Sequence, residues 1–246
     1  MKRILVLLML VLTVSPGWLL ADDRWEQIRN PADRNEVRTY VRTVEGSSIK
    51  QFKGIVEVPQ SMLTAIAVIS DVHNFDNWVF NCQGTEVRRE EWGTDYLRIK
   101  INGIWPASDR DVVIRSSYYQ DPDTQAITVR SQSTEGLLEP QRGFVRIAAL
   151  DNFFVVEPLA DGWTRITFQT FVHPGGSLPA WIANFVATRA PVQTLEGLRQ
   201  QMAREEYQLQ TPEQLPSPLP GSPRLEFPEG TLMSVEPAGE GSADAA

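Results

Sequence analysis

Few residues in this chain have the types and spacing that catalysis or metal binding would need. His73 lies near Asp71 and Asp76, where imidazole and carboxylate groups could in principle hold a metal ion, but the segment is a polar loop after a helix, and solvated loop residues account for it better. The single cysteine, Cys82, has no base beside it in the sequence, which favours a buried, inert thiol over a nucleophile. The patterns G-x-S-x-G, H-E-x-x-H and the P-loop do not occur. We therefore expect no catalytic residue, no metal and no cofactor.

A binding role for Arg146 is the most specific chemical hypothesis that the residues suggest. Arg146 alternates with Phe144, Ala148 and Leu150, so a continuous strand would direct all four side chains to one face. A buried guanidinium is costly without an anionic or oxygen partner, and Arg146 would then hold a carboxylate or an oxygen or phosphate of a ligand. The opposite strand register would instead turn Arg146 to solvent.

The elements that would position these residues are mostly strands. Segments rich in Val, Ile, Thr and aromatic residues predict strands over 37–44, 49–58, 85–91, 94–102, 111–120, 126–133, 144–159 and 163–172. A helix is predicted from Ser61 to Val72, and a turn or bulge at Asp151-Asn152 inside the longest strand. Strands that follow one another without intervening helices favour a single antiparallel sheet.

One long helix closes the domain. The turn Pro174-Gly175-Gly176 ends the last strand, and Ser177 is placed to cap a helix in which Pro191 should produce a kink. Its predicted apolar face comprises Trp181, Ile182, Phe185, Val186, Val192, Leu195, Leu198 and Met202. Such a helix must bury this face against the sheet, which predicts an α+β domain whose sheet grips a helix.

Small residues in the middle of several strands suggest that the space between sheet and helix is not simply filled. These residues are Ser116-Ser117, Ser131, Ala148-Ala149 and Thr170. Small side chains facing a helix leave volume that either the helix or a ligand must occupy. The residues alone leave both interpretations open, because Trp181 and Phe185 could fill the gap.

The two ends of the chain differ from its middle. Lys2 and Arg3, the apolar run 4–14 and the residues up to Ala21 have the layout of a signal peptide, so we expect residues 1–21 to be removed and the protein to be exported to the periplasm or secreted. An uncleaved N-terminal anchor is the alternative. Residues 208–246 are rich in proline and acidic residues, and we expect a disordered tail there. The remaining residues, 22–207, suffice for one domain.

The charge of the chain restricts its partners. The formal net charge is −8 for the whole sequence, and it becomes more negative without Lys2 and Arg3. Binding to nucleic acid needs a basic face, so we expect no nucleic-acid partner. Docking on anionic lipid by charge alone is excluded in the same way.

Four segments, in the right order, resemble the START (StAR-related lipid-transfer) family. They are 52–54 (FKG), 69–72 (ISDV) with Trp78, 104–111 (IWPASDRD) and 174–184 (PGGSLPAWIAN). The chain departs from the family at His173, where members often have Asp, and at Ile104, where many have Pro. The resemblance implies the helix-grip fold, in which a curved antiparallel sheet wraps around a long C-terminal helix and encloses a tunnel for one lipid.

The resemblance turns the apolar positions into candidates for a pocket. The pocket candidates are Trp78, Leu97, Ile99, Ile101, Ile114, Phe144, Arg146, Phe168, Trp181 and Phe185, most of which could equally be ordinary core. In the family, the loop that corresponds to 102–109 covers the mouth of the tunnel. The lid and entrance candidates are therefore Gly103, Ile104, Trp105, Gly175 and Gly176. Trp105 would insert into a donor membrane, unless it packs on the helix instead.

We thus expect a monomeric, non-enzymatic carrier that makes transient contact with membranes. Its ligand would be one lipid, whether a phospholipid, a sterol-like molecule or a fatty acid. Two other classes stay open at this point. One is an enzyme of the cyclase or hydrolase type in a helix-grip cavity, and the other is a non-catalytic interaction module that uses the acidic tail.

Overall fold

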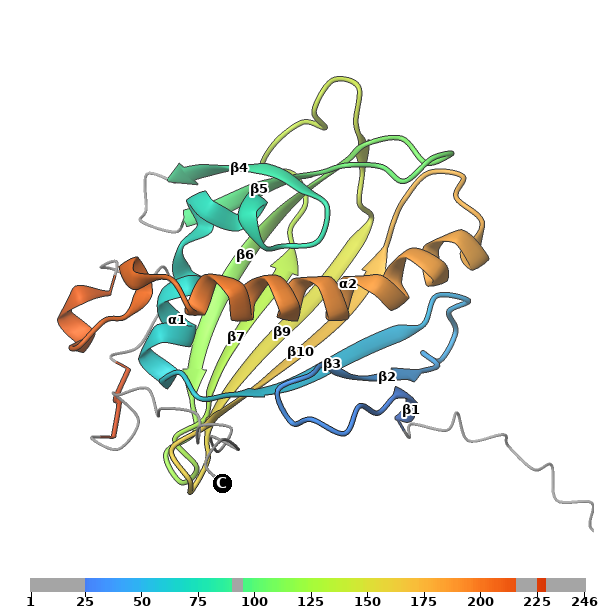
Figure 1. Cartoon of the computed structure of the whole chain (residues 1–246). Helices are drawn as coiled ribbons and strands as arrows, with labels where there is room; N and C mark the ends of the chain where they lie inside the picture. The colour runs from blue at the N-terminus through green and yellow to red at the C-terminus, as the bar shows by residue number, and fades with distance from the viewer. Residues whose placement is uncertain (1–24, 90–94, 216–224, 229–246) are drawn as a thin grey trace, which may run out of the picture.

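A computed structural model describes residues 25–89, 95–215 and 225–228 (Figure 1). The predicted signal peptide, 1–21, and most of the predicted tail lie outside these residues. None of the helices within the described ranges combines the length and the apolar character that crossing a membrane would take.

One large sheet forms the body of the domain. Its strands are β1 (Glu26–Arg29), β2 (Arg38–Arg42), β3 (Gln51–Val58), β4 (Cys82–Arg89), β5 (Asp95–Ile101), β6 (Arg110–Gln120), β7 (Ile127–Ser133), β8 (Val145–Arg146), β9 (Ala149–Pro158) and β10 (Thr164–His173). The strand order is β1-β2-β3-β10-β9-β7-β6-β5-β4, with every neighbouring pair antiparallel. The short β8 lies off this path and pairs in parallel with β6.

The helices lie along the concave side of the sheet. They are α1 (Met62–Ser70), α2 (Ala180–Met202) and the short 3-10 helices η1 (Val72–Asn77), η2 (Glu205–Tyr207) and η3 (Pro212–Gln214). In Figure 1, α2 crosses in front of the central strands, with α1 at its C-terminal end. The predicted α+β class and helix-grip arrangement are confirmed.

Local sequence explains where the two α-helices begin. Ser61 caps α1, because its hydroxyl accepts a hydrogen bond from the amide of Thr64 at 3.1 Å. The long helix begins at Ala180 with Pro179 at its cap position, so the predicted cap, Ser177, lies outside it. The helix continues through Pro191, which packs over β3, where Gly54 leaves room for it.

The predicted strand 144–159 is interrupted, and the interruption is not at Asp151-Asn152. The chain leaves β8 after Arg146 and starts β9 at Ala149, with Ile147 and Leu150 both buried. The break occurs because β8 pairs with β6, whereas β9 pairs with β7 and β10. It shifts the alternation on which the prediction for Phe144 and Arg146 depended.

Parts of the C-terminal tail have a definite place. Leu209, Leu215, Leu225 and Phe227 pack against the main core cluster. Gln120 at the end of β6 also exchanges two hydrogen bonds, of 2.7 and 2.8 Å, with the backbone of Glu226. Residues 208–215 and 225–228 of the predicted tail thus lie against the domain, because their apolar side chains find a surface to cover.

Candidate functional site

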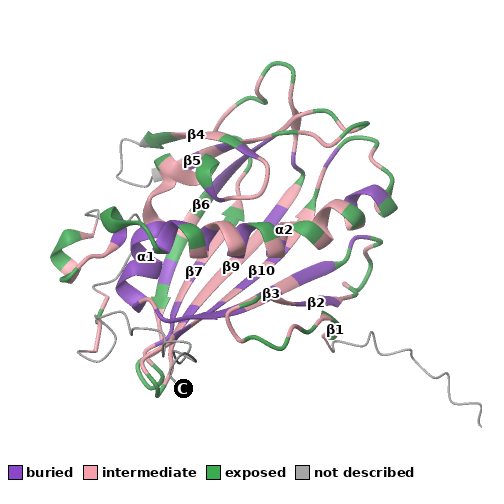
Figure 2. Ribbon diagram, in the orientation of Figure 1, coloured by how far each residue is buried: buried purple, intermediate pink, exposed green. Residues whose placement is uncertain are grey.

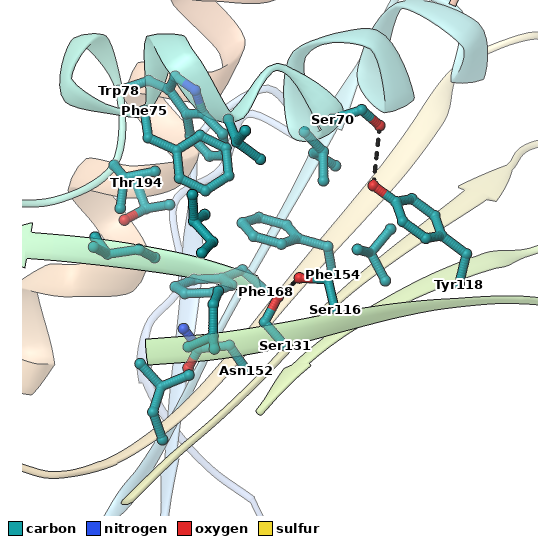
Figure 3. Close-up of a pocket in the computed structure, with 18 of the residues that line it drawn as sticks. Ser70, Phe75, Trp78, Ser116, Tyr118, Ser131, Asn152, Phe154, Phe168 and Thr194 are labelled. Carbon is teal, nitrogen blue, oxygen red and sulfur yellow. Dashed lines mark hydrogen bonds between the residues drawn. The ribbon is translucent and has the colours of Figure 1, made fainter. Parts of the chain in front are cut away.

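A cavity lies between the sheet and a cover formed by the end of α1, η1 and Thr194 of α2; its empty space is about 960 Å³, a value that includes space open to solvent. We call it the inner cavity. Figure 3 shows its two sides, with Phe75, Trp78 and Thr194 facing side chains that project from the sheet. Its lining is mostly apolar with a few polar groups, as in pockets that hold small-molecule ligands.

Aromatic rings build much of the inner cavity's wall. Trp78, directly after η1, meets Phe75 edge-on at 5.2 Å between ring centroids and Phe154 at 5.9 Å. Phe154 in turn stacks on Phe168 of the neighbouring strand at 4.5 Å. These contacts fix the rings and leave an apolar surface facing the open space (Figure 3).

Polar groups of the inner cavity are uncharged. Ser116 and Ser131 share a hydrogen bond of 2.8 Å across β6 and β7, and the hydroxyls of Ser70 and Tyr118 lie 3.2 Å apart. Burial raises the pKa of Tyr118, so its phenol stays protonated at neutral pH. Asn152 completes this set of side chains on the sheet side (Figure 3).

A second cavity, of about 760 Å³ including open space, lies at the other end of α2, and we call it the lid cavity. It is enclosed by the loop 102–109 and by the N-terminal half of α2. The loop is held in shape by a hydrogen bond of 2.9 Å from the amide of Gly103 to the carboxylate of Asp109. Lys50 and Arg110 give this cavity a basic edge that the inner cavity lacks.

Eight of the residues predicted for the pocket or its lid line one of the two cavities. Trp78, Leu97, Ile99, Ile114 and Phe168 line the inner cavity, and Ile101, Gly103 and Ile104 line the lid cavity. Trp105 projects from the lid loop with 91% of its surface exposed, and so does not pack on the helix. Gly175 and Gly176 form a tight turn with positive φ angles before α2.

Four predicted pocket residues lie elsewhere, two of them on α2. Trp181 and Phe185 are 72% and 51% exposed and line neither cavity, so they do not fill the space under the helix. Helical rotation explains this result, because the positions that face the sheet are the next residues along, Ile182, Ala183 and Val186.

The other two residues that line neither cavity, Phe144 and Arg146, lie just before the break between β8 and β9. Phe144 is half-buried outside both cavities, and Arg146 points to the carboxylate of Asp111 rather than to a ligand. Arg146 donates from Nε and Nη2 to the two Asp111 oxygens, each at 3.0 Å. Its partner is therefore supplied by the protein itself.

Several cavity residues were missed by sequence reasoning. They are Ile69, Ser70, Val72, Phe75, Val79, Val87, Tyr96, Val129, Leu150, Asn152, Phe154 and Thr194 in the inner cavity. Asn152 had been assigned to a turn, and Thr194 lies among larger apolar residues of the helix. The only feature of the sequence that pointed to polar residues in the cavities was the series of small residues in the middle of strands. Of these, Ser116 and Ser131 line the inner cavity and Thr170 lines the lid cavity.

Asp71 and Cys82, two of the residues first considered for catalysis or metal binding, have structural surroundings that account for them. Asp71 accepts hydrogen bonds from Asn74 at 2.6 Å and from the phenol of Tyr207 at 2.9 Å. Burial raises the pKa of the Cys82 thiol, which keeps it protonated. Across 25–89, 95–215 and 225–228, no three potential metal-binding side chains come together.

Comparisons with known proteins agree with this geometry. The family model described as START domain matches residues 15–208. An uncharacterised protein of Pseudomonas aeruginosa is 30% identical over 183 residues, which cover 74% of this chain and 88% of that protein.

Several solved structures have a similar fold, among them the two that follow. The crystal structure of a fragment of a STAR-related lipid transfer protein from Xanthomonas axonopodis is 29% identical, with a TM-score of 0.65, and the match covers 73% of this chain and 99% of that one. Human STARD10 is 22% identical, with a TM-score of 0.64, over 87% of this chain and 88% of that one.

Proposed function

Because this chain belongs to the START domain family, we propose that it takes a single lipid from a bilayer into the space beneath α2 and carries it, as a monomer, to another membrane or to a partner. The observation that supports this most is the inner cavity, which is apolar, partly open and bounded by fixed aromatic rings. Each methylene moved from water into such a space contributes about 0.8 kcal/mol, so a long acyl chain is strongly favoured there.

The lid end is the face that we propose meets the membrane. Trp105 is on the lid loop, and Trp181 and Phe185 are on the N-terminal half of α2, so three exposed aromatic side chains lie on the two elements that enclose the lid cavity. Aromatic rings favour the interface between water and lipid, where their apolar bodies leave water. A bilayer is the occupant that best fits this surface, because a lipid leaving it would pass directly into the lid cavity.

Transfer between vesicles tests the membrane contact. We expect Trp105→Ala to lower the rate of lipid transfer between neutral phosphatidylcholine vesicles about fivefold or more, since it removes most of an apolar side chain from the contact. The amount of lipid held at equilibrium should not change. Tyr119→Ala is the matched control, because Tyr119 is also exposed but lies on β6, away from the lid cavity. An unchanged rate in Trp105→Ala rules the insertion out.

The residues that line the inner cavity favour a role in carrying a lipid over a role in catalysis. The described residues that line it include no His, Cys, Lys, Arg, Asp or Glu, the side chains on which most acid, base and nucleophilic steps depend. Native mass spectrometry of the purified protein tests this proposal, because it reports both the oligomeric state and any retained lipid. A protein that holds no lipid but converts a hydrophobic test substrate would overturn the assignment.

Export is part of the same proposal. It is supported by the sequence of residues 1–21 alone, with cleavage after Ala21. Fractionation of the producing cells, followed by N-terminal sequencing, should find a chain that begins at Asp22 in the exported fraction. A full-length chain in the membrane fraction would show that the segment is retained as an anchor.

A further inference from the structure

A row of short polar side chains crosses the sheet under α2. Strand register places Ser116 opposite Ser131, Ser131 opposite Asn152, and Asn152 opposite Thr170. Residues directly opposite each other project on the same face of a sheet. The row therefore runs across four strands, from β6 to β10, on the face that carries the cavities.

The rows on either side of it are mostly apolar. One comprises Tyr118, Val129, Phe154 and Phe168, which are opposite one another in the same four strands. The other includes Ile114 and Leu150, which line the inner cavity. A hydrophobic ligand that lies along the sheet must therefore cross a narrow polar band in otherwise apolar surroundings.

In this polar band, formed by Ser116, Ser131, Asn152 and Thr170, not every polar atom has a hydrogen-bond partner within the described part of the protein. Ser116 and Ser131 pair with each other, but Oδ1 of Asn152 is buried and finds no hydrogen-bond partner in the described part of the chain. A second lining residue, Trp78, is only 4% exposed, and its indole N–H likewise finds no partner there. Buried polar groups without partners cost about 1–3 kcal/mol each, so a ligand that supplies partners gains correspondingly.

Charge limits what that ligand can place in the inner cavity. The described lining residues carry no charged side chain, and an ionised group there would lose its hydration without compensation. The unpartnered groups are one acceptor and one donor. A hydroxyl can donate a hydrogen bond to Oδ1 of Asn152, whereas an ether or an ionised carboxylate has no hydrogen to donate.

We propose that the inner cavity selects a lipid whose buried portion is uncharged and carries a hydroxyl group, which hydrogen bonds to the side chain of Asn152. This inference rests on the proposed function and specifies its ligand class. An ionised fatty acid or a phosphate group would have to leave its charged end outside, toward Lys50 and Arg110 of the lid cavity.

The test compares three ligands that share a long alkyl chain and differ in the polar group at its end. The probes are 1-hexadecanol, its methyl ether 1-methoxyhexadecane, and hexadecanoate at pH 7.5, each offered in phosphatidylcholine vesicles to the delipidated full-length protein. Bound probe is counted by mass spectrometry after removal of the vesicles. We expect Asn152→Leu to weaken binding of 1-hexadecanol about three- to tenfold and to leave the other two probes unchanged or slightly stronger.

The matched control is Gln132→Leu. Gln132 is exposed on the same sheet, beside Ser131 in β7, and lies outside both cavities. The substitution Gln132→Leu therefore replaces an amide side chain by leucine, as Asn152→Leu does, but away from the ligand. Gln132→Leu should bind all three probes as the wild type does. Asn152→Ala, which cannot crowd the cavity, should show the same selective loss as Asn152→Leu, and thermal unfolding verifies that each variant is folded.

The outcomes separate this inference from the proposed function. Equal changes for all three probes, or none, overturn the role of Asn152 but leave lipid carriage intact. A selective loss of hexadecanoate would place a charged group at Asn152 and overturn the inference too. A wild-type protein that takes up no probe contradicts the proposed function itself.

Discussion

The carboxylate of Asp111 has no exposure to solvent, and both of its oxygens are occupied by the guanidinium of Arg146. Its Oδ2 also accepts a hydrogen bond from the amide of Gln141 at 3.1 Å. Burial alone would raise the pKa of Asp111, but the hydrogen bonds from Arg146 and Gln141 outweigh it and hold that pKa below its usual value. The pair fixes β8 and the chain after it to β6, which makes it a structural contact.

We expect Asp111→Asn to lower the free energy of unfolding by about 3 kcal/mol, because the partly buried guanidinium of Arg146 loses its counter-charge. Urea unfolding at pH 7 measures the loss. The matched control is Asp151→Asn in the pair formed by Arg130 and Asp151, which has the same two-bond geometry at 2.9 Å but is about one third exposed or more. That change should cost less than about 1 kcal/mol. Equal losses would contradict the argument from burial.

Asp111→Asn should also change how the free energy of unfolding depends on pH in the acidic range. Since the native pKa of Asp111 lies below its unfolded value of about 3.9, the stability it contributes is present above that pH. It is lost as the pH falls below about 4 and the carboxylate becomes protonated. The unfolding free energy of Asp111→Asn should therefore fall less steeply between pH 5 and pH 3 than that of the wild type.

At the scale of elements, sequence periodicity predicted the fold better than the orientation of single side chains. Both α-helices and most strands appear within a few residues of their predicted positions, because alternation and turn residues persist over many positions, but β1 was not predicted and the strand 144–159 is divided into β8 and β9. Trp181 and Phe185 were predicted as pocket residues from the apolar pattern of the helix, yet the side of α2 that faces the sheet follows the smaller Ala183, Ala187 and Ala190. A pairing such as that of β8 with β6 is not encoded locally, so the orientation of Arg146 could not be predicted.

The contact between α2 and η1 depends on a glycine in the helix. A Cβ on Gly197 would lie 2.7 Å from the carbonyl oxygen of Trp78 and 2.9 Å from its Cα. Both are backbone atoms, so they cannot move aside as a flexible side chain would. Gly197 thus sets the distance at which Trp78, a wall of the inner cavity, lies from the long helix.

We expect Gly197→Ala to destabilise the protein by about 1–3 kcal/mol, because the added methyl group forces α2 and Trp78 apart. Intrinsic helix propensity predicts the opposite sign, a gain of about 1 kcal/mol. Thermal unfolding therefore decides between the two effects. Gln193→Ala, at an exposed position of the same helix, is the control and should stay within about 0.5 kcal/mol of the wild type. A more stable Gly197→Ala would show that the contact with Trp78 is loose.

Viewed as a whole, the molecule has one firmly packed end and one loosely covered end. The C-terminal half of α2 is buried through Leu195, Leu198 and Met202, as the burial colours along the helix indicate (Figure 2). Tyr207 beyond it donates a hydrogen bond to Asp71 at the end of α1. The N-terminal half lies over the lid cavity and has exposed aromatic residues instead. Between the halves, Pro191 has no amide hydrogen to donate within the helix. Opening should therefore involve the N-terminal half of α2 and the lid loop, while the other half stays in place.

Hydrogen exchange along the whole chain measures this asymmetry. Amides of the lid loop and of residues 180–190 should exchange at least tenfold faster than those of residues 194–202, because opening a loosely packed segment costs less free energy than opening the core. Loading the protein with lipid should slow exchange most in the first group, since a bound lipid favours the closed cover, whereas the second group is already protected by the core. Uniform protection across α2 in the delipidated protein would contradict this, and lipid would then have to enter by another route.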